Sequence, residues 1–325
     1  MPRKQATAGQ TFGYEVLHRQ ALSDRKDMRC LGSASDSSLA QMGQIHQWAD
    51  MVAGSCVPGG KVDGMEAQPS RLAQAREWYV ENVDAIPADG WTKSTLCAGW
   101  TARHLVAHVA TGDQLFLGML MDAFGKDRTA LDLPTDFADR RQRFEAMSTW
   151  EPARLKETAR KASEETVAAI GDAAREAPQT IVNVPFGQVP IPVVRGLRLN
   201  EYIIHGHDLT PAIGRPIPIP DWFIDRALGD SINLMSRLHQ RSPHKGKAAS
   251  FHIHRTDGEG EWILRAADGQ AVAESTHGKA DVALRGSGEG LYWVLMGRGS
   301  LNDHGIEIHG DPALAAAFKE WFPGP

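Results

Sequence analysis

The stretch L-C-A-G-W-T-A-R-H-L-V-A-H-V-A, residues 96–110, carries the clearest structural signal in this chain of 325 residues. Thr101 is a residue type that caps helices at their N-terminus, and apolar residues recur after it at helical spacing to about Gly125. His104 and His108 lie one turn apart on this helix. His108 stands among apolar neighbours, where an inward imidazole needs a partner to offset desolvation. We expect His108 to face the interior and His104 to face solvent.

Three further segments with helical spacing lie on either side of this helix. The chain between the second and third of these segments contains several prolines, which predicts an extended conformation there. Four antiparallel helices of this kind are typical of an up-and-down four-helix bundle. The three segments cover about residues 70–86, 137–176 with a break near Pro152, and 193–213.

The period of the apolar residues changes after a proline-rich hinge at residues 215–222. An amphipathic helix, about 221–240, is followed by short alternating runs separated by Gly and Asp-Gly turns, with two short helices at about 288–297 and 311–321. This pattern predicts a small α+β domain with a largely antiparallel sheet. The fold class is therefore an α-helical bundle, residues 66–218, followed by an α+β domain, residues 219–325.

The first 64 residues differ from the rest in composition. Gly, Ser, Gln and charged residues dominate, without a sustained apolar period, so we expect residues 1–65 to be a disordered extension. Regular patterning begins just after Met65, and our hypothesis is that the natural protein starts there.

Composition excludes several classes of function. The net charge of −5 and the pI near 6.2, without a dense basic cluster, argue against a nucleic-acid partner. We find no apolar run of the roughly 20 residues that cross a membrane and no secretory signal, so we expect a cytoplasmic protein. Three widely spaced cysteines fit neither a disulfide framework nor a four-thiolate site. Any metal must rely on histidine and carboxylate ligands.

A candidate set of such ligands is present. Glu201-Tyr-Ile-Ile-His205 places a carboxylate and an imidazole on one face of a helix, and His108 could add a third ligand from a neighbouring helix. Catalytic zinc sites use three such ligands and leave one position open. The same spacing also occurs in ordinary surface pairs, and an apolar-flanked histidine can be a satisfied core residue. Spacing alone leaves both interpretations open.

Resemblance to a known family favours the metal. Residues 96–110, quoted above, and R-L-N-E-Y-I-I-H-G-H-D-L, residues 198–209, resemble the two motifs of the mycothiol-dependent maleylpyruvate isomerase family, part of the DinB-like metalloenzyme superfamily. In that family the last histidine of the first motif and the Glu and His of the second bind the metal. The resemblance therefore implies His108, Glu201 and His205 as metal ligands.

The resemblance covers about residues 66–323. A-D-V-A-L-R-G-S, residues 280–287, and L-M-G-R, residues 295–298, resemble the sterol-carrier-like domain of these isomerases. Two positions depart from the family pattern: Ala98 is commonly proline, and His104 is commonly acidic, where it could complete a capping box with Thr101. Both lie near the helix start and leave the ligand set intact.

The function that the resemblance implies is metal- and thiol-dependent. A divalent metal, expected to be zinc, would activate mycothiol as the thiol cosubstrate, because a coordinated thiol is deprotonated at neutral pH. The family contains isomerases of cis-enone diacids, which we favour here, and thiol transferases. The resemblance also implies that Arg298 faces the cleft and holds a carboxylate of a small acidic substrate, although an arginine complementing its own helix C-terminus is the alternative.

Two other functions stay open, namely a non-enzymatic small-ligand carrier with a structural metal site and a metal-dependent hydrolase. The substrate, the native metal and the oligomeric state are also open, with a monomer as one option. Among the remaining polar residues, we interpret Cys97 as structural rather than nucleophilic, and we expect His207 to face away from the ligands. Asp208 either orients an imidazole or lies on the helix surface. His252 and His254 are interpreted as surface residues.

Overall fold

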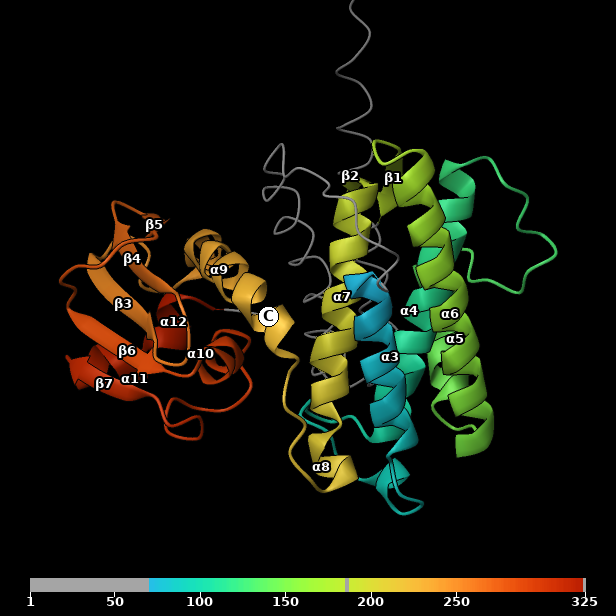
Figure 1. The fold of residues 1–325 in the computed structure, drawn as a ribbon, viewed down its shortest axis with the longest axis horizontal. Coiled ribbons are helices and arrows are strands. Elements are labelled where there is room, and N and C mark those ends of the chain that lie inside the picture. The colour runs from blue at the N-terminus through green and yellow to red at the C-terminus, as the bar shows by residue number, and fades with distance from the viewer. Residues whose placement is uncertain (1–69, 185–186, 324–325) are drawn as a thin grey trace, which may run out of the picture. The chain divides into compact units, whose positions relative to one another are not determined.

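The structure is a computed structural model that describes residues 70–184 and 187–323 (Figure 1). The predictions made for residues 1–65, including the start at Met65, lie outside the described residues. The first described part is a helical bundle, the class that the sequence predicted, and in it α4 packs on α6 and α3 packs on α7. Its helices are α3 (Arg71–Asp84), α4 (Ala102–Ala123), α5 (Phe137–Met147), α6 (Pro152–Glu176) and α7 (Ile191–Asp208), with a 3-10 turn η2 (Gly90–Thr92) before α4.

The helix boundaries follow from local residue chemistry. The Ser70 side chain accepts a hydrogen bond from the backbone N–H of Ala73 at 3.2 Å and so caps α3. Pro152 occupies the first position of α6, where its missing N–H costs nothing, and this explains the predicted break after α5. At the start of α4, His104 Nδ1 lies 3.3 Å from the backbone N and 2.8 Å from Oγ1 of Thr101. His104 is thus half-buried and takes part in the cap, which corrects its expected solvent-facing position.

The segment predicted as one helix over 193–213 divides in two. After the hairpin of β1 (Ile181–Val184) and β2 (Gly187–Pro190), α7 ends at Asp208 and a short α8 (Thr210–Ile213) follows. Pro211 has no N–H and its ring blocks the carbonyl of His207, so the helix cannot continue regularly. The Thr210 hydroxyl donates to that carbonyl at 2.7 Å instead.

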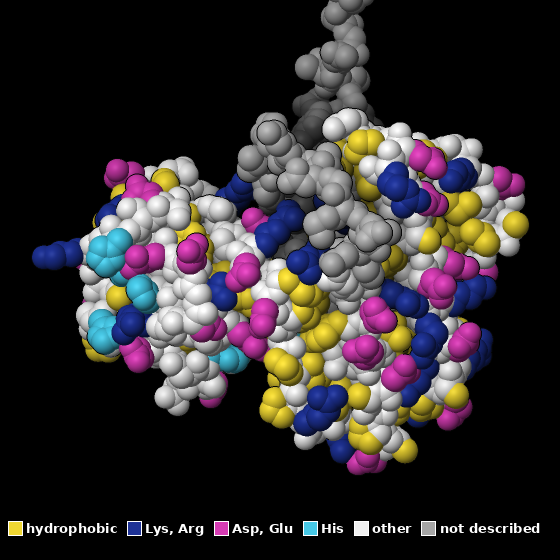
Figure 2. All heavy atoms as spheres, in the orientation of Figure 1, with side chains coloured by type: hydrophobic (Ala, Val, Ile, Leu, Met, Phe, Trp, Pro, Cys, Tyr) yellow, Lys and Arg dark blue, Asp and Glu magenta, His cyan; other side chains and the backbone are white. Residues whose placement is uncertain are grey.

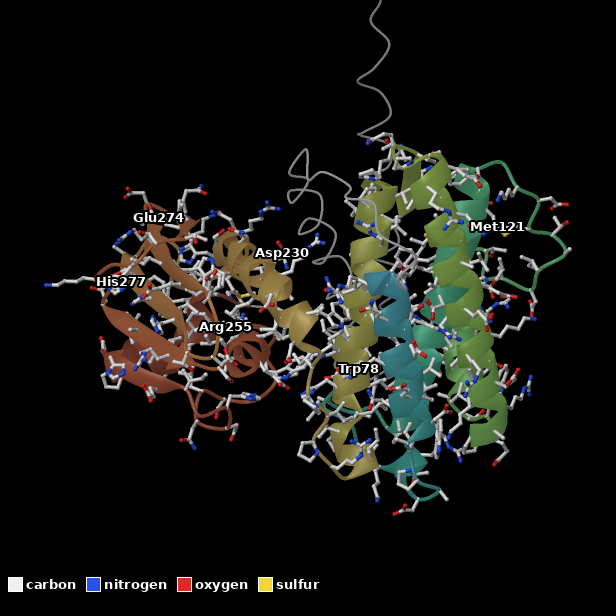
Figure 3. The ribbon with its side chains drawn as sticks, in the orientation of Figure 1. Trp78, Met121, Asp230, Arg255, Glu274 and His277 are labelled. Carbon is white, nitrogen blue, oxygen red and sulfur yellow. The ribbon has the colours of Figure 1, made fainter. Side chains whose placement is uncertain are left out.

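One close approach fixes the α3 and α7 pair. Gly206 of α7 lies against the Trp78 ring of α3, so a Cβ at position 206 would overlap that ring. Trp78 is labelled on α3 in Figure 3. A glycine at this position therefore lets the two helices pack closely beside the candidate ligands Glu201 and His205.

The second part begins with α9 (Asp221–Leu238) and contains a five-stranded sheet, in agreement with the predicted α+β class. The strand order is β5-β4-β3-β6-β7, and all neighbours are antiparallel except the parallel pair β3 and β6. The single helix predicted over about residues 311–321 is divided into two short helices. The remaining elements are η3 (His239–Arg241), β3 (Ala249–Arg255), β4 (Glu261–Ala267), β5 (Gln270–Glu274), β6 (Val282–Gly286), α10 (Gly288–Leu295), β7 (Glu307–Gly310), α11 (Pro312–Ala316) and α12 (Phe318–Trp321).

The two faces of this sheet differ. Phe251 of β3 packs edge-on against Phe318, Trp321 and Phe322, with ring centroids 5.1 to 5.8 Å apart, and this is the core face. Because side chains alternate along a strand, His252 points to the opposite face. Among the described residues, no helix is long and apolar enough to cross a membrane.

Candidate metal centre

The structure brings His108, Glu201 and His205 together. Glu201 Oε2 lies 3.4 Å from His108 Nε2 and 3.6 Å from His205 Nε2. Both distances are long for hydrogen bonds, which cluster near 2.9 Å. Bonds of about 2.0 to 2.1 Å to a tetrahedral ion place ligand atoms roughly 3.3 Å apart. The spacing of the three donor atoms therefore fits a shared cation better than it fits a hydrogen-bonded pair.

The electrostatics of the three groups match this arrangement. His108 is 8 % exposed, and burial lowers its pKa to about 3 against the opposing effect of the nearby Glu201 carboxylate, so its imidazole is neutral at pH 7. Burial raises the pKa of Glu201, but the nearby imidazoles of His108 and His205 and the charge of Arg198 hold that pKa well below its ordinary value. Glu201 is therefore ionised. A neutral imidazole and a carboxylate are the protonation states that metal ligands require.

Asp208 orients His205. Its Oδ2 lies 3.0 Å from His205 Nδ1, and the carboxylate is fully buried. A carboxylate accepts the proton of Nδ1, which leaves the lone pair of Nε2 for a metal. This contact bears out the orienting role that the sequence left as one of two options for Asp208.

Arg298 is engaged by the same carboxylate. Its Nε and Nη2 donate to the two oxygens of Asp208, each at 3.1 Å, and its Nη1 donates to the Met296 carbonyl at 2.9 Å. Burial alone would raise the pKa of Asp208, but the charge of Arg298 and the bonds that it and His205 donate hold it well below its ordinary value. In this structure the donor fork of Arg298 holds Asp208, which in turn contacts the candidate ligand His205, and the role expected for Arg298 toward a substrate carboxylate stays a prediction.

Cys97 belongs to this network. Its Sγ donates to Asp208 Oδ2 at 3.1 Å and lies 3.9 Å from His205 Nδ1, so these three residues also form a possible ligand group. Burial and the charge of Asp208 raise the pKa of the thiol well above its ordinary value. The Cys97 thiol donates to Asp208, and the same carboxylate is held by Arg298 and by His205. The contacts favour a hydrogen-bond network over a metal site and agree with the structural interpretation of Cys97.

No sequence pattern predicts the contact between Arg140 and His108. Arg140 of α5 is buried, and its Nη2 donates to the His108 carbonyl at 3.1 Å and lies 3.2 Å from His108 Nδ1. A guanidinium can only donate, so the carbonyl is its acceptor whenever Nδ1 of His108 carries the ring proton. The Trp100 ring, 4.9 Å away between centroids, packs on the same imidazole. Arg140 and Trp100 together fix the position of His108.

A buried ion pair lies behind Glu201. Arg198 Nη2 is 2.7 Å from Asp113 Oδ1, and the side chains are 1 % and 0 % exposed. Tyr202 donates to the same oxygen at 2.7 Å, while Arg198 Nη1 lies 3.8 Å from Glu201 Oε2. The pair therefore ties α4 to α7 and places a positive charge next to the candidate carboxylate ligand.

Two remaining features lie apart from these ligands. His207 stacks on Trp293 with centroids 3.7 Å apart and its Nδ1 lies 3.0 Å from the Ile217 carbonyl, so it faces away as predicted. A cavity of about 310 Å³ is lined from α3, α7 and α9, with Leu199 and Trp222 among its lining residues. None of the three candidate ligands lines it. A molecule bound in that cavity would not meet them.

Replacing Arg298 by alanine tests the network behind His205. The change leaves Asp208 as a buried charge without its cation, so His205 loses its fixed orientation. We expect the dissociation constant for zinc to rise by about 10- to 100-fold, the usual cost of losing a group that orients a ligand. Competition with a chromophoric chelator measures it. Arg175→Ala is the control, because Arg175 pairs with Asp172 on the exposed surface of α6; equal affinities in the two variants would contradict the role of Arg298.

Comparisons with known proteins identify the family of both domains. The sequence model of the mycothiol maleylpyruvate isomerase N-terminal domain matches residues 72–210, which include the helical bundle and all three candidate ligands. The model of the C-terminal domain of the same isomerases matches residues 227–317. The two domains occur in the order expected from the sequence motifs.

Solved structures share the fold. A crystal structure of the mycothiol-dependent maleylpyruvate isomerase matches with a TM-score of 0.52 at 18 % identity, covering 71 % of this chain and 88 % of that one. A histidine-to-alanine mutant of that isomerase matches with a TM-score of 0.53 at 19 % identity, covering 74 % and 90 %. A search among curated proteins finds no match. With both domain models matched in order along most of the described residues, the chain belongs to the mycothiol maleylpyruvate isomerase family.

Proposed function

We propose that this protein is a metal-dependent enzyme of the maleylpyruvate isomerase type that uses mycothiol as its thiol cosubstrate. The observation that carries the proposal is the convergence of His108, Glu201 and His205 at the spacing of metal ligands. Two imidazoles and one carboxylate suit zinc, and three protein ligands leave a position for a cosubstrate. The matching solved structures are described as mycothiol-dependent maleylpyruvate isomerases. At 18 and 19 % identity, the match supports the fold of this chain and does not identify its substrate.

The residues of the chain prepare the site in defined ways. Asp208 keeps the proton of His205 on Nδ1, and Arg298 holds Asp208 in place. Glu201 brings one negative charge, so a dication at this site keeps a net charge near +1 and attracts anions. A divalent ion held by these three side chains would lower the pKa of a bound thiol and so would supply a thiolate at neutral pH.

The reaction proposed for this thiolate is reversible addition. Its sulfur adds to the double bond of a cis-enone diacid, and the electron pair of that double bond moves toward the conjugated carbonyl. The carbon–carbon bond, now single, rotates, and return of the electron pair expels the thiolate to give the trans isomer. Thiol and catalyst are regenerated, so no oxidant or reductant is required.

The experiment that tests this proposal supplies mycothiol, zinc and maleylpyruvate to the full-length protein and follows the isomer ratio by NMR. We expect conversion only when both thiol and metal are present, and none with Glu201→Ala. Consumption of mycothiol with an electrophile but no isomerisation would overturn the isomerase in favour of a thiol transferase. Turnover of the substrate without any thiol would favour a metal-dependent hydrolase over both the isomerase and the thiol transferase. No turnover of any kind would favour a non-enzymatic ligand carrier.

We also propose that the protein works in the cytoplasm, where low-molecular-weight thiols are kept reduced. Its partners would then be small molecules, namely the thiol and a small acidic substrate.

A further inference from the structure

A second group of histidines converges in the sheet domain, within the part of the chain that the structure describes. Glu261 Oε1 lies 2.7 Å from His252 Nε2, 2.8 Å from His254 Nδ1 and 2.7 Å from His277 Nδ1. His252 is only 9 % exposed. The expectation that His252 and His254 are ordinary surface residues is therefore wrong for His252, which is buried.

The sheet fixes three of the four side chains. His252 and His254 alternate on β3 and so share the face opposite Phe251. In the antiparallel ladder, His254 stands directly across from Glu261 of β4, which places the carboxylate beside both imidazoles. Their mutual positions depend on strand register and therefore do not rely on a loop.

The fourth side chain, that of His277, lies on a loop that crosses this face. His277 lies between β5 and β6, and the adjacent Gly278 lies against Ile263 of β4 so closely that a Cβ would be 2.9 Å from Ile263 Cδ1. His277 is labelled beside β3 and β4 in Figure 3, and Figure 2 shows histidines gathered on the surface of this domain. The absence of a side chain at Gly278 thus allows His277 to reach Glu261.

Each of the three nitrogen–oxygen distances is that of an ordinary hydrogen bond, so the unusual feature is the number of nitrogens around one oxygen and not their spacing. A carboxylate oxygen has about two lone-pair positions, yet three imidazole nitrogens surround the single atom Glu261 Oε1. Bonds from His277 and His254 lower the pKa of Glu261 to about 2, so the carboxylate is ionised at neutral pH. Nearby cations on this face have partners of their own: Arg285, across from His254, pairs with Glu307 at 3.1 Å.

We propose that His252, His254, His277 and Glu261 form a second metal site, which binds zinc with four protein ligands. Three imidazoles and one carboxylate are ligands that zinc accepts, and a complete set of four is typical of structural rather than catalytic sites. The ligand atoms of His252, His254 and Glu261 already lie within 4.8 Å of one another. His277, which contacts the same carboxylate oxygen from its loop, would complete the set, and zinc held by these side chains would tie the loop before β6 to the β3–β4 hairpin. This inference is independent of the proposed enzyme activity.

Zinc content of the full-length protein tests the site, by equilibrium dialysis against zinc followed by elemental analysis. We expect two equivalents in the wild type. Glu261→Ala and His277→Ala should each lose one of them, and His277→Ala changes a side chain that is 79 % exposed, so the fold should survive. His309→Ala is the matched control, because His309 lies on the same sheet, is 60 % exposed and is outside the cluster.

Two further readouts separate this site from the first. Glu201→Ala should keep one equivalent of zinc, and that equivalent should disappear when His277→Ala is added. Cobalt bound to Glu201→Ala should give the intense visible bands of a tetrahedral ion, which His277→Ala abolishes. Thiol-dependent turnover should be the same in His277→Ala as in the wild type. Unchanged zinc content in both Glu261→Ala and His277→Ala would overturn the proposal. If instead the site of His108, Glu201 and His205 binds no zinc, the wild type should hold a single equivalent, and His277→Ala should remove it.

Discussion

Replacing Glu201 by alanine is expected to abolish zinc binding between α4 and α7 and, with it, thiol-dependent turnover. Glu201 supplies the only negative charge among the three candidate ligands, and its oxygen lies between the two imidazoles. The loss should exceed the roughly 10- to 100-fold that removal of an orienting group costs in metal affinity. Zinc titration of the variant in a His277→Ala background measures this site alone.

The control for this variant is His104→Ala. His104 stands one turn before His108 on α4 but contacts Thr101 at the helix start. Its loss should cost about 1 kcal/mol of stability, as for other capping residues, and leave the zinc content unchanged. Full zinc occupancy in Glu201→Ala, or equal zinc loss in both variants, would refute the ligand set.

Replacing Arg198 by methionine should give the largest loss of stability. The change leaves Asp113 as a fully buried carboxylate without its cation, and breaking a buried pair from one side typically costs about 3 to 5 kcal/mol. Urea unfolding followed by circular dichroism measures the change. The control is Arg160→Met, because Arg160 pairs with Asp84 at the exposed surface, where a pair contributes at most about 1 kcal/mol.

The effect of Arg198→Met should also depend on pH. Burial raises the pKa of Asp113, and the charge of Arg198 opposes that rise. Without the arginine the pKa of Asp113 rises further, so the folded variant binds a proton more readily than the unfolded chain does. Its stability deficit should therefore shrink as the pH falls and grow as the pH rises. A deficit below about 1 kcal/mol at neutral pH would show that the pair does not hold α4 and α7 together.

Much of the fold could be predicted from the sequence because its signals are local. The Thr101 cap, the break at Pro152 and the change from helical to alternating apolar spacing each depend on a few adjacent residues. The division of the last bundle helix was missed, although Pro211 carries the signal for it. The closing helix was likewise predicted as one and is two short helices, α11 and α12.

The site was predictable where its residues share a helix or an apolar environment. The spacing of Glu201 and His205 places both on one face, and the neighbours of His108 indicate an inward ring. The partners behind them could not be foreseen in the same way. Arg298 meets Asp208 from the other domain, and Arg140 reaches His108 from α5, which carries few buried residues. Such contacts depend on tertiary packing and leave no periodic pattern.

The second histidine cluster could likewise be predicted only in part from the sequence. The alternation of His252 and His254 on a strand, with Glu261 following after a short turn, was a signal that could have suggested a shared face. The loop that brings His277 to the same carboxylate depends on the close contact of Gly278 with Ile263. No spacing rule connects His277 with the other three residues.

The most direct test of the ligand set is anomalous X-ray diffraction at the zinc absorption edge, from crystals of the full-length protein grown with zinc. We predict a peak between α4 and α7 bonded to His108 Nε2, a Glu201 carboxylate oxygen and His205 Nε2, at about 2.0 to 2.2 Å from each. A map with no anomalous peak among these three side chains, or with a peak bonded instead to Cys97 and Asp208, would contradict the account.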